Sequence, residues 1–391
     1  MKTIGKEIGM QSHRTFLKEG LFAGLTTPHI GLLNNNPEQD TFNKAIKSID
    51  IVVQNEINKG LFPGAVIAGG KYEGFHFIKA YGHARIVPEF VPMYEDTLFD
   101  LESLTKVIGT STALTICIDN EIIDINAPAR HYLRDFSGKG TKDILIRHLV
   151  THTSGYAWGR VCNGEKICDF FANVLNRKTD HEVGVQYMYS NINAILTGMI
   201  IESIVNESFG DYCLQKIFKP LKMHDTLFSP IPNGYNIAAS RSEILYVAAN
   251  EDVRSAGRQI GTAGLFSTAY DLTKFCRVWL GEGAVNGVKL FSKDSWNLAI
   301  SNLSHDINNP IGVFWKKSVK ELDRPTQMSI YAFGHSGYTG QSIWIDPRKD
   351  IYTIVLTNRN HPKLEKSGTL RGKEQYLARG RIADSIISVF E

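Results

Sequence analysis

Ser103 and Lys106 stand three residues apart in the stretch 97–110, where an apolar strand end runs into a predicted helix. Residues with this spacing share one face of a helix, so we expect the lysine amine beside the serine hydroxyl. An alcohol is a weak nucleophile near neutral pH, but a lysine whose pKa is lowered by burial can take its proton. The N-terminus of the helix adds N–H groups that stabilise an oxyanion. The pair therefore predicts Ser103 as a catalytic nucleophile and Lys106 as its activator.

The alternative is a chance quartet, because roughly one or two Ser-x-x-Lys spacings are expected in a chain of this length. This quartet is the only one in the sequence, and it lies at a strand-to-helix junction rather than in a polar loop. The quartet alone is weak evidence, so other motifs have to decide its meaning.

The second candidate motif is Tyr189-Ser190-Asn191, the only Tyr-x-Asn in the chain, directly before a predicted helix. A tyrosine beside a lysine can hold a depressed pKa and act as general base towards Ser103 and as general acid towards the leaving group. The Asn191 amide would donate to a substrate carbonyl. In the alternative interpretation, which is favoured when this motif is judged alone, Ser190 or Asn191 only caps the helix while Tyr189 packs.

The third candidate motif lies in the stretch 331–346, a predicted strand whose glycines allow close approach of another backbone. A strand edge offers N–H and C=O groups to an extended acyl substrate, and the Tyr338 N–H would be a second oxyanion donor beside that of Ser103. The substrate-binding residues expected here are His335, Ser336, Gly337 and Tyr338. The alternatives are a histidine that serves only a hairpin turn, and a rival Lys366-Ser367-Gly368 motif in a polar segment.

Composition limits the classes of function. The 391 residues are 43% hydrophobic and 21% charged with a formal net charge of +3, which argues against a nucleic-acid or membrane-surface partner. No run of the roughly 18 apolar residues that a membrane span requires is present. The stretch 16–25 is interrupted by charges and lacks a clear cleavage site for a signal peptide, so we expect a cytoplasmic protein.

Five cysteines are an odd number in a large chain and predict reduced thiols rather than a disulfide framework. Cys162 and Cys168 lack a second close pair, and His148 and His152 lack a third ligand at suitable spacing for a metal. No glycine-rich phosphate or dinucleotide loop is convincing. We therefore expect no metal and no cofactor.

The elements that must position the motifs are strands near both ends of the sequence and helices between them. Apolar spacing predicts a helix over 42–59, a hairpin from 64–71 and 75–81, and a helix from Ser103 to Asp119. Further strands are expected at 312–315, 331–335, 341–346 and 351–357, and further helices at 144–151, 191–205, 209–216, 268–280 and 372–390.

This order of elements predicts an α+β fold, an antiparallel sheet flanked by helices with an inserted all-helical subdomain. Residues 1–43 are expected to form an N-terminal arm and residues 44–391 the catalytic domain. Within that domain, the sheet subdomain is expected at about 44–119 and 262–391, and the helical subdomain at about 120–261.

Taken in chain order, the three motifs make the sequence resemble the serine β-lactamase and penicillin-binding protein superfamily. The Tyr-x-Asn motif is similar to that of the class C-like branch, which includes AmpC-type β-lactamases, DD-peptidases, D-aminopeptidases and family VIII-type esterases. The segments 100–106, 148–155 and 264–268 also look like this family. The resemblance covers about residues 44 to 391 and implies a β-lactamase/transpeptidase-like fold.

The resemblance also implies a serine acyl-enzyme route, in which Ser103 attacks a carbonyl, Lys106 and Tyr189 manage the proton, and water deacylates. One departure is His335-Ser336-Gly337 in place of Lys-Thr-Gly. A neutral or titrating histidine is a weaker and pH-dependent anchor for a β-lactam carboxylate than a lysine ammonium. The expected function is therefore hydrolysis of small esters or amides, including D-amino-acid-containing ones, with weak or no β-lactamase activity.

Two other functions on the same fold stay open. An acyltransferase or transpeptidase would pass the acyl group to an amine or alcohol, and a penicillin-binding receptor would deacylate slowly. Turnover after acylation, and its dependence on an added acceptor, would discriminate between these three functions.

Overall fold

The computed structural model describes residues 37–74, 76–162, 169–240, 245–304, 309–363 and 368–391. Its internal contacts separate residues 1–44 from residues 45–391. Helix α1 (Pro37–Asn58) opens in the first unit, and its residues from 45 onwards belong to the second. Most of the predicted N-terminal arm, and Lys366 and Ser367 of the rival third motif, lie outside the described residues.

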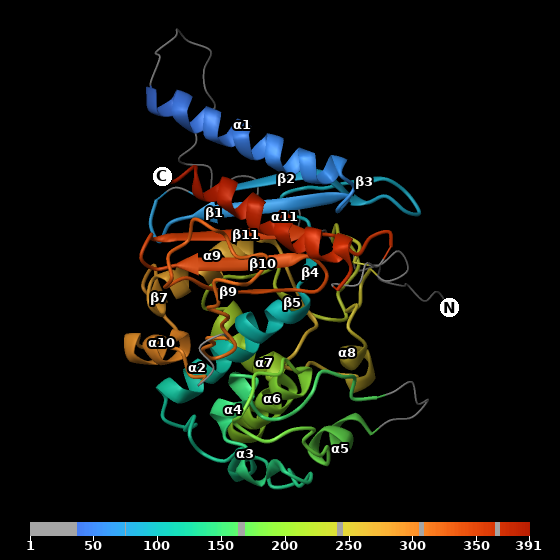
Figure 1. The fold of residues 1–391 in the computed structure, drawn as a ribbon, viewed down its shortest axis with the longest axis vertical. Helices are drawn as coiled ribbons and strands as arrows, with labels where there is room; N and C mark the ends of the chain where they lie inside the picture. The colour runs from blue at the N-terminus through green and yellow to red at the C-terminus, as the bar shows by residue number, and fades with distance from the viewer. Residues whose placement is uncertain (1–36, 75, 163–168, 241–244, 305–308, 364–367) are drawn as a thin grey trace, which may run out of the picture. The chain divides into compact units, whose positions relative to one another are not determined.

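A six-stranded antiparallel sheet forms the centre of the second unit, in the order β3-β2-β1-β11-β10-β9 (Figure 1). Its strands are β1 (Gly64–Gly70), β2 (His76–Arg85), β3 (Val91–Pro92), β9 (Phe333–Ser336), β10 (Gln341–Asp346) and β11 (Ile351–Thr357). β1 pairs with β11, so that Ala65 lies opposite Thr357. The α+β prediction, with an antiparallel sheet built from both ends of the sequence, is confirmed.

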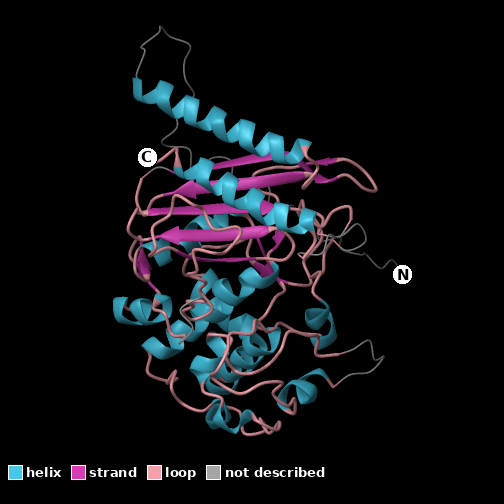
Figure 2. Cartoon of the chain, viewed as in Figure 1, coloured by secondary structure: helices cyan, strands magenta, loops and turns pink. Residues whose placement is uncertain are grey.

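Helices cover both faces of this sheet (Figure 1, Figure 2). On one face, α11 (Leu370–Ile387) and the later part of α1 share a core in which Val53 and Ile382 pack with Val355 of β11. On the other face, α9 (Ala269–Leu280) contacts β1, β10 and β11. Because both faces are covered, β10 and β11 are buried along their whole length. This burial suits the β-branched and aromatic residues of these strands.

Helices make up most of the regular structure between β3 and β9, and many of them gather below the sheet in Figure 2. A second sheet joins β4 (Phe99–Asp100), β6 (Leu265–Ser267) and β5 (Leu227–Phe228). The helices here are α3 (Ala129–Tyr132), the 3-10 turn η4 (Thr141–Asp143), α4 (Ile146–Val150), α5 (Phe170–Leu175), α6 (Asn191–Val205), α7 (Phe209–Cys213), the π-helical η5 (Leu214–Phe218) and α8 (Glu251–Ala256). After α9 follow β7 (Ala284–Val285), β8 (Val288–Lys289) and α10 (Lys293–Ile300).

The helix expected from Ser103 to Asp119 is not a uniform α-helix. It begins as the 3-10 turn η2 (Glu102–Leu104), continues as the π-helical η3 (Lys106–Ser111) and becomes α-helical only in α2 (Thr112–Asp119). Gly109 lies in the π-helical part, where an added Cβ would come within 3.2 Å of the Phe209 ring. Short π-helical turns are frequent at functional sites, and here one carries Lys106.

The strand expected at 312–315 is wrong. Phe314 has a left-handed φ of 60°, and its N–H donates to the Val150 carbonyl of the helical region at 3.0 Å. These two features turn the backbone away from an extended course. Only Lys316 pairs with β9, through an isolated bridge to Gly334.

Two sequence expectations concern cysteines and membranes. Cys162 is disulfide-bonded, which corrects the expectation that its thiol is reduced, whereas Cys117, Cys213 and Cys276 are free and buried.

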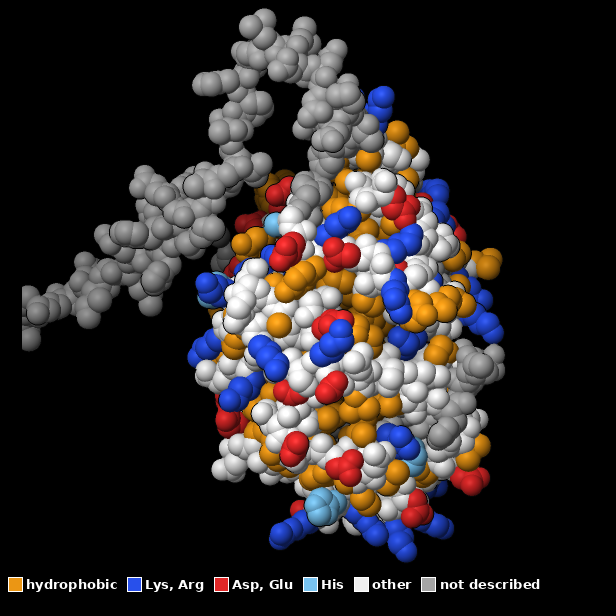
Figure 3. Space-filling view, turned by 90° about the vertical axis from the view of Figure 1, so that its left-hand side faces the viewer, with side chains coloured by type: hydrophobic (Ala, Val, Ile, Leu, Met, Phe, Trp, Pro, Cys, Tyr) orange, Lys and Arg blue, Asp and Glu red, His pale blue; other side chains and the backbone are white. Residues whose placement is uncertain are grey.

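Within the described ranges, no helix combines the length and apolar character needed to cross a bilayer. Figure 3 shows acidic and basic side chains interspersed on the visible face, in keeping with the near balance of charges in the sequence.

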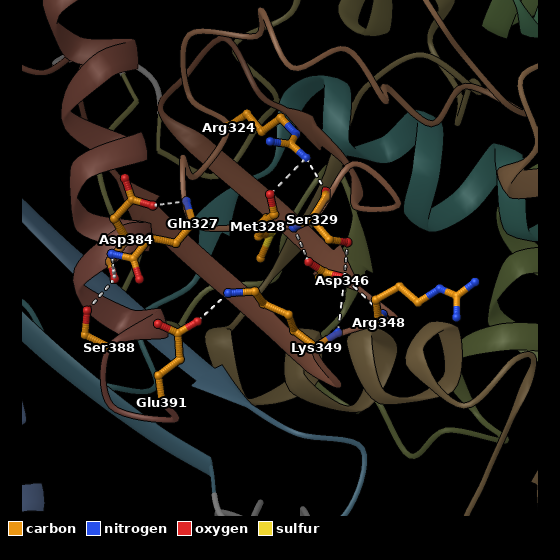
Figure 4. A network of polar contacts seen from close by, with 10 residues as sticks. All are labelled: Arg324, Gln327, Met328, Ser329, Asp346, Arg348, Lys349, Asp384, Ser388 and Glu391. Atoms are coloured by element: carbon orange, nitrogen blue, oxygen red, sulfur yellow. Dashed lines mark hydrogen bonds and ion pairs between the residues drawn. The ribbon is translucent and has the colours of Figure 1, made fainter.

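A polar network holds the loop 324–332 that leads into β9 (Figure 4). The carboxylate of Asp346, buried at the end of β10, accepts hydrogen bonds from the Ser329 N–H at 2.6 Å and the Ser329 hydroxyl at 2.8 Å. It also accepts two backbone N–H groups of the turn that follows β10. Asp384 on α11 accepts the Gln327 N–H at 3.0 Å. The loop is therefore tied to the sheet on one side and to α11 on the other.

We expect Asp346→Ala to lower the free energy of unfolding by about 3 kcal/mol, because the hydrogen bonds of the buried Asp346 carboxylate to Ser329 and to the turn after β10 are lost. Urea unfolding followed by tryptophan fluorescence measures the change. Lys349→Met is the matched control, since it removes only the exposed ion pair with Glu391 in the same network and should cost less than about 0.5 kcal/mol. Equal losses of unfolding free energy in the two variants would contradict the stabilising role predicted for Asp346.

Candidate active site

Ser103 follows a sharp turn whose backbone is fixed by neighbouring polar groups. Glu102, directly before it, has a left-handed φ of 47°, a conformation that non-glycine residues adopt rarely. The Asp100 carboxylate holds this turn, since it accepts the Glu102 N–H at 3.1 Å and the Ala249 N–H at 2.8 Å. Ser103 itself is 8% exposed. The turn therefore fixes the position of Ser103 and leaves a small part of this residue exposed to solvent.

The structure brings the three predicted catalytic side chains together at one oxygen atom. Ser103 Oγ lies 3.1 Å from Lys106 Nζ and 2.9 Å from the Tyr189 hydroxyl. Lys106 comes from η3, and Tyr189 comes from the segment that leads into α6. Residues 86 apart in sequence thus converge on the expected nucleophile.

Lys106 is completely buried, and its amine has three oxygen partners. Besides Ser103 Oγ, these are Asn191 Oδ1 and the Thr262 carbonyl, each at 3.0 Å. A protonated amine can donate to all three. A neutral amine keeps its two N–H groups on Asn191 and Thr262, because those oxygens accept and do not donate. Its lone pair then faces the Ser103 hydroxyl, which is the one partner that can give up a proton.

The electrostatic surroundings of Lys106 suit a proton acceptor. Burial lowers the pKa of Lys106 to about 7, although the negative charges of Glu102 and Asp252 act in the opposite direction. Burial and the charge of Asp100 raise the pKa of Glu102 to about 7. The negative charge of Glu102 favours the protonated form of Lys106, so the protonation state of one group depends on that of the other. A large fraction of Lys106 is therefore neutral near pH 7.

The depressed pKa expected for Tyr189 is wrong. Burial raises the pKa of Tyr189, because removing a phenolate from water costs more than nearby positive charges return. Lys106 Nζ lies 5.1 Å from the centre of the tyrosine ring, over its face. Tyr189 is therefore protonated in the resting site, and its hydroxyl donates to Ser103 Oγ.

Asn191 is engaged with protein groups at both ends of its amide. Its oxygen accepts from Lys106 and from the Thr262 hydroxyl at 2.9 Å, and its nitrogen donates to Asp252 Oδ2 at 3.3 Å. This orientation links the Asp252 carboxylate to the Lys106 amine. The structure thus places Asn191 as a support of the lysine, whereas its expected contact with a substrate carbonyl stays a prediction.

His335 lies on β9 with its ring centre 6.2 Å from that of Tyr189. The ring is 1% exposed, and Nδ1 lies 3.0 Å from the Ser336 carbonyl oxygen. A carbonyl only accepts, so Nδ1 carries the hydrogen and Nε2 holds a lone pair. Burial and the positive charges of Lys316 and Lys106 keep the pKa of His335 well below its usual value. The third motif therefore contributes no positive charge near pH 7.

The hairpin that follows β9 is fastened to the residues directly before Ser103. The Thr339 hydroxyl donates to the Asp100 carbonyl at 2.9 Å. At Gly337 an added Cβ would come within 2.5 Å of the Leu101 carbonyl oxygen, so a larger residue would push the two segments apart. Ser336 and Tyr338, which flank Gly337, are consequently held near the Ser103 turn.

His152 is a further residue of the site, for which sequence analysis predicted no part in catalysis. It is completely buried, and its ring centre lies 4.6 Å from that of Tyr189. Its Nδ1 accepts the Ser190 N–H at 3.3 Å, and Asn193 Nδ2 lies 3.0 Å away. Burial lowers the pKa of His152 well below its usual value. A neutral His152 ring therefore packs against Tyr189. Among the described residues, no group of side chains that could hold a metal ion is found.

Comparisons with known proteins identify the family and the fold of this chain. A sequence model of the family described as Beta-lactamase matches residues 49–376. One relative, the N-acetylmuramyl-L-alanine amidase of Bacillus subtilis (strain 168), is 26% identical over 364 residues, which cover 81% of this chain and 82% of the relative.

Solved structures share the fold. A class C beta-lactamase superposes with a TM-score of 0.72 at 19% identity, covering 92% of this chain and 98% of that one. EstCE1, described as a hydrolase with promiscuous acyltransferase activity, gives a TM-score of 0.69 at 17% identity and covers 91% of this chain and 100% of its own. The family match extends over most of the sequence, so this chain belongs to the Beta-lactamase family, as a serine hydrolase with the class C-like fold.

Proposed function

We propose that the protein hydrolyses small esters or amides, including D-amino-acid-containing ones, through an acyl-enzyme on Ser103. The observation that carries this proposal is the pair of contacts at Ser103 Oγ, one to the Lys106 amine and one to the Tyr189 hydroxyl. One neighbour can take a proton near pH 7, and the other can give one. A nucleophile between an acceptor and a donor is the arrangement that acyl transfer requires.

In the acylation step, Ser103 Oγ bonds to the substrate carbonyl carbon while its proton passes to Lys106. The backbone N–H groups of Ser103 and Tyr338 are proposed to hold the resulting oxyanion. As the bond to the leaving oxygen or nitrogen breaks, Tyr189 gives that atom its proton and regains one from Lys106. A water molecule then repeats the sequence on the acyl-enzyme and releases the acid.

Weak or absent β-lactamase activity is part of the proposal. A β-lactam carboxylate needs a cation, and the buried, neutral His335 provides none. The name of the Bacillus subtilis relative describes an amidase, which supports an amide substrate for this chain as well.

Acyl transfer to an amine or alcohol is the second candidate function. Its support is the description of EstCE1 as a hydrolase with promiscuous acyltransferase activity on the same fold. Both functions use the same acyl-enzyme and differ in the acceptor that releases it.

We expect wild-type protein to turn over a p-nitrophenyl ester or a D-alanyl p-nitroanilide and to act poorly on penicillin. Ser103→Ala should lower kcat/KM by at least about a thousandfold, because the nucleophile is gone. Released chromophore and intact protein mass are measured on the same samples.

The mass measurement separates the candidate functions. Stable addition of an acyl group without turnover, followed by release on adding an amine or alcohol, would favour the acyltransferase. Equal activity in wild type and Ser103→Ala would contradict the proposed nucleophile.

The activity should rise with pH through about 7, because the base form of Lys106 is the neutral amine. The negative charge of Glu102 favours protonated Lys106, so Glu102→Gln should shift the acidic limb to lower pH by about 0.5 to 1 unit. The limb is read from kcat/KM between pH 5 and 9. Glu89→Gln, which alters an exposed ion pair with Arg85, should not shift the acidic limb of the pH profile. A shift of the Glu102→Gln limb to higher pH would overturn this assignment.

A further inference from the structure

The peptide that joins Gly337 to Tyr338 carries the N–H group proposed to hold the oxyanion. In the hairpin after β9, the Gly337 N–H donates to the Gln341 carbonyl at 2.8 Å, and the Gly340 N–H donates to the Gly337 carbonyl at 3.2 Å. A stiffer residue is excluded at Gly337, because an added Cβ would come within 2.5 Å of the Leu101 carbonyl oxygen. Glycine adopts a wide range of backbone torsions, so a peptide next to it rotates at little cost unless its groups are held. The direction of this N–H therefore depends on what binds the Gly337 carbonyl.

A buried arginine of α11 binds this carbonyl. Arg379 is completely buried, and its Nη1 donates to the Gly337 carbonyl at 3.1 Å and to the Gln341 carbonyl at 2.8 Å. The centre of its guanidinium lies 4.1 Å from the centre of the Tyr376 ring on the same helix. A planar guanidinium that stacks on a ring is well ordered for hydrogen bonding. Arg379 belongs to none of the three motifs, and its bond to Gly337 joins residues 42 apart.

The direction of the carbonyl fixes the direction of the N–H on the same peptide. In a trans peptide the C=O and N–H bonds point in opposite directions within one plane. The bond between Gly337 and Tyr338 is trans, because every cis bond among the described residues precedes a proline. With its carbonyl directed at Arg379, this peptide turns its N–H away from the guanidinium. The hairpin is also fastened to the segment before Ser103, through the Thr339 hydroxyl, so the N–H stays in the part of the sheet that contacts the nucleophile's turn.

The burial of Arg379 is costly, because a guanidinium loses its hydration there. Its Nη2 lies 3.6 Å from Asp323 Oδ2, and the two side chains are 0% and 1% exposed. That distance is too long for a hydrogen bond, so within the described residues the hydrogen bonds of Arg379 go to the two hairpin carbonyls. Buried ion pairs often add little stability compared with apolar side chains of similar size. Positioning of the hairpin therefore explains this arginine better than stability does.

We propose that Arg379 is a positioning residue, which holds the Gly337 carbonyl so that the Tyr338 N–H faces the oxyanion of the acyl-transfer step. Arg379 acts through this peptide and does not touch the substrate. A guanidinium stays protonated at every pH at which enzymes work, so the direction of the N–H is independent of the titration of Lys106. This inference rests on the proposed function and adds a residue to the same site.

The test compares p-nitrophenyl acetate with its thiono analogue, in which sulfur replaces the carbonyl oxygen. N–H groups stabilise a negative oxygen much better than the larger sulfur, so the ratio of the two kcat/KM values measures the oxyanion site. Wild type should prefer the oxygen ester. Arg379→Met should lower kcat/KM for the oxygen ester by about a hundredfold and change that for the thiono ester by less than about threefold.

Arg381→Met is the matched control. Arg381 lies on the same helix and pairs with Glu56 and Glu374, so its loss removes ion pairs of α11 that do not involve the hairpin. The ratio of the two kcat/KM values should stay at the wild-type level. Equal losses on both esters in Arg379→Met, or the same fall of the ratio in Arg381→Met, would overturn the proposal.

Two further variants allow for the stability of the protein, which thermal unfolding measures for each of them. Arg379→Met combined with Asp323→Asn removes both buried charges and should show the same fall of the ratio. Arg379→Lys keeps a charged donor without the planar geometry of the guanidinium, so the ratio should fall by about tenfold. If Arg379→Lys is the only folded variant, a wild-type ratio in it would overturn the proposal.

Crystal structures of wild type and of a folded Arg379 variant provide a readout that needs no turnover. In the variant, the peptide between Gly337 and Tyr338 should be rotated, with its carbonyl turned away from α11. An unchanged peptide would overturn the proposal. If the peptide rotates but wild type hydrolyses neither ester, the proposed function fails, and the role of Arg379 in orienting this peptide stands.

Discussion

A lysine without access to solvent is the constraint on which the rest of the site depends. Burial disfavours the charged form of Lys106, while Glu102 and Asp252 favour it, so the amine is balanced between two protonation states. The elements around Lys106 supply the partners that stabilise each of these two protonation states. The π-helical turn places the amine beside Ser103, α6 supplies the Asn191 oxygen, and the turn before β6 supplies the Thr262 carbonyl. A shift of any of these elements would change where the proton rests.

The parts of the structure that the sequence predicted are those determined by local pattern. The β1–β2 hairpin, the buried strands β10 and β11, and the helix capped by Thr268 follow from apolar runs, turn residues and a capping side chain. The closeness of Ser103 and Lys106 follows from their spacing of three. Tyr189 could be placed beside them only through resemblance, because its contact spans 86 residues.

The features that escaped sequence analysis depend on contacts between distant segments. The strand expected at 312–315 failed because Phe314 is bound by a carbonyl of the helical region. Arg379 belongs to no motif, and its hydrogen bond to the Gly337 carbonyl joins residues 42 apart. The pKa of Tyr189 moved against expectation because the depth of burial, which the sequence does not report, outweighs a nearby charge.

The pairing of β1 with β11 has a consequence for how the chain reaches this structure. Ala65 and Thr357 are partners in the middle of the sheet, so β1 finds this neighbour only after the chain has been synthesised as far as β11. Such distant pairing makes folding slow, because a very long loop has to close before the contact rewards it. During that delay the apolar faces of β1 and β2 lack their cover, and the nascent chain is exposed to aggregation and to chaperones. Catalytic competence would therefore arise late, because the central sheet is complete only once β11 has joined it.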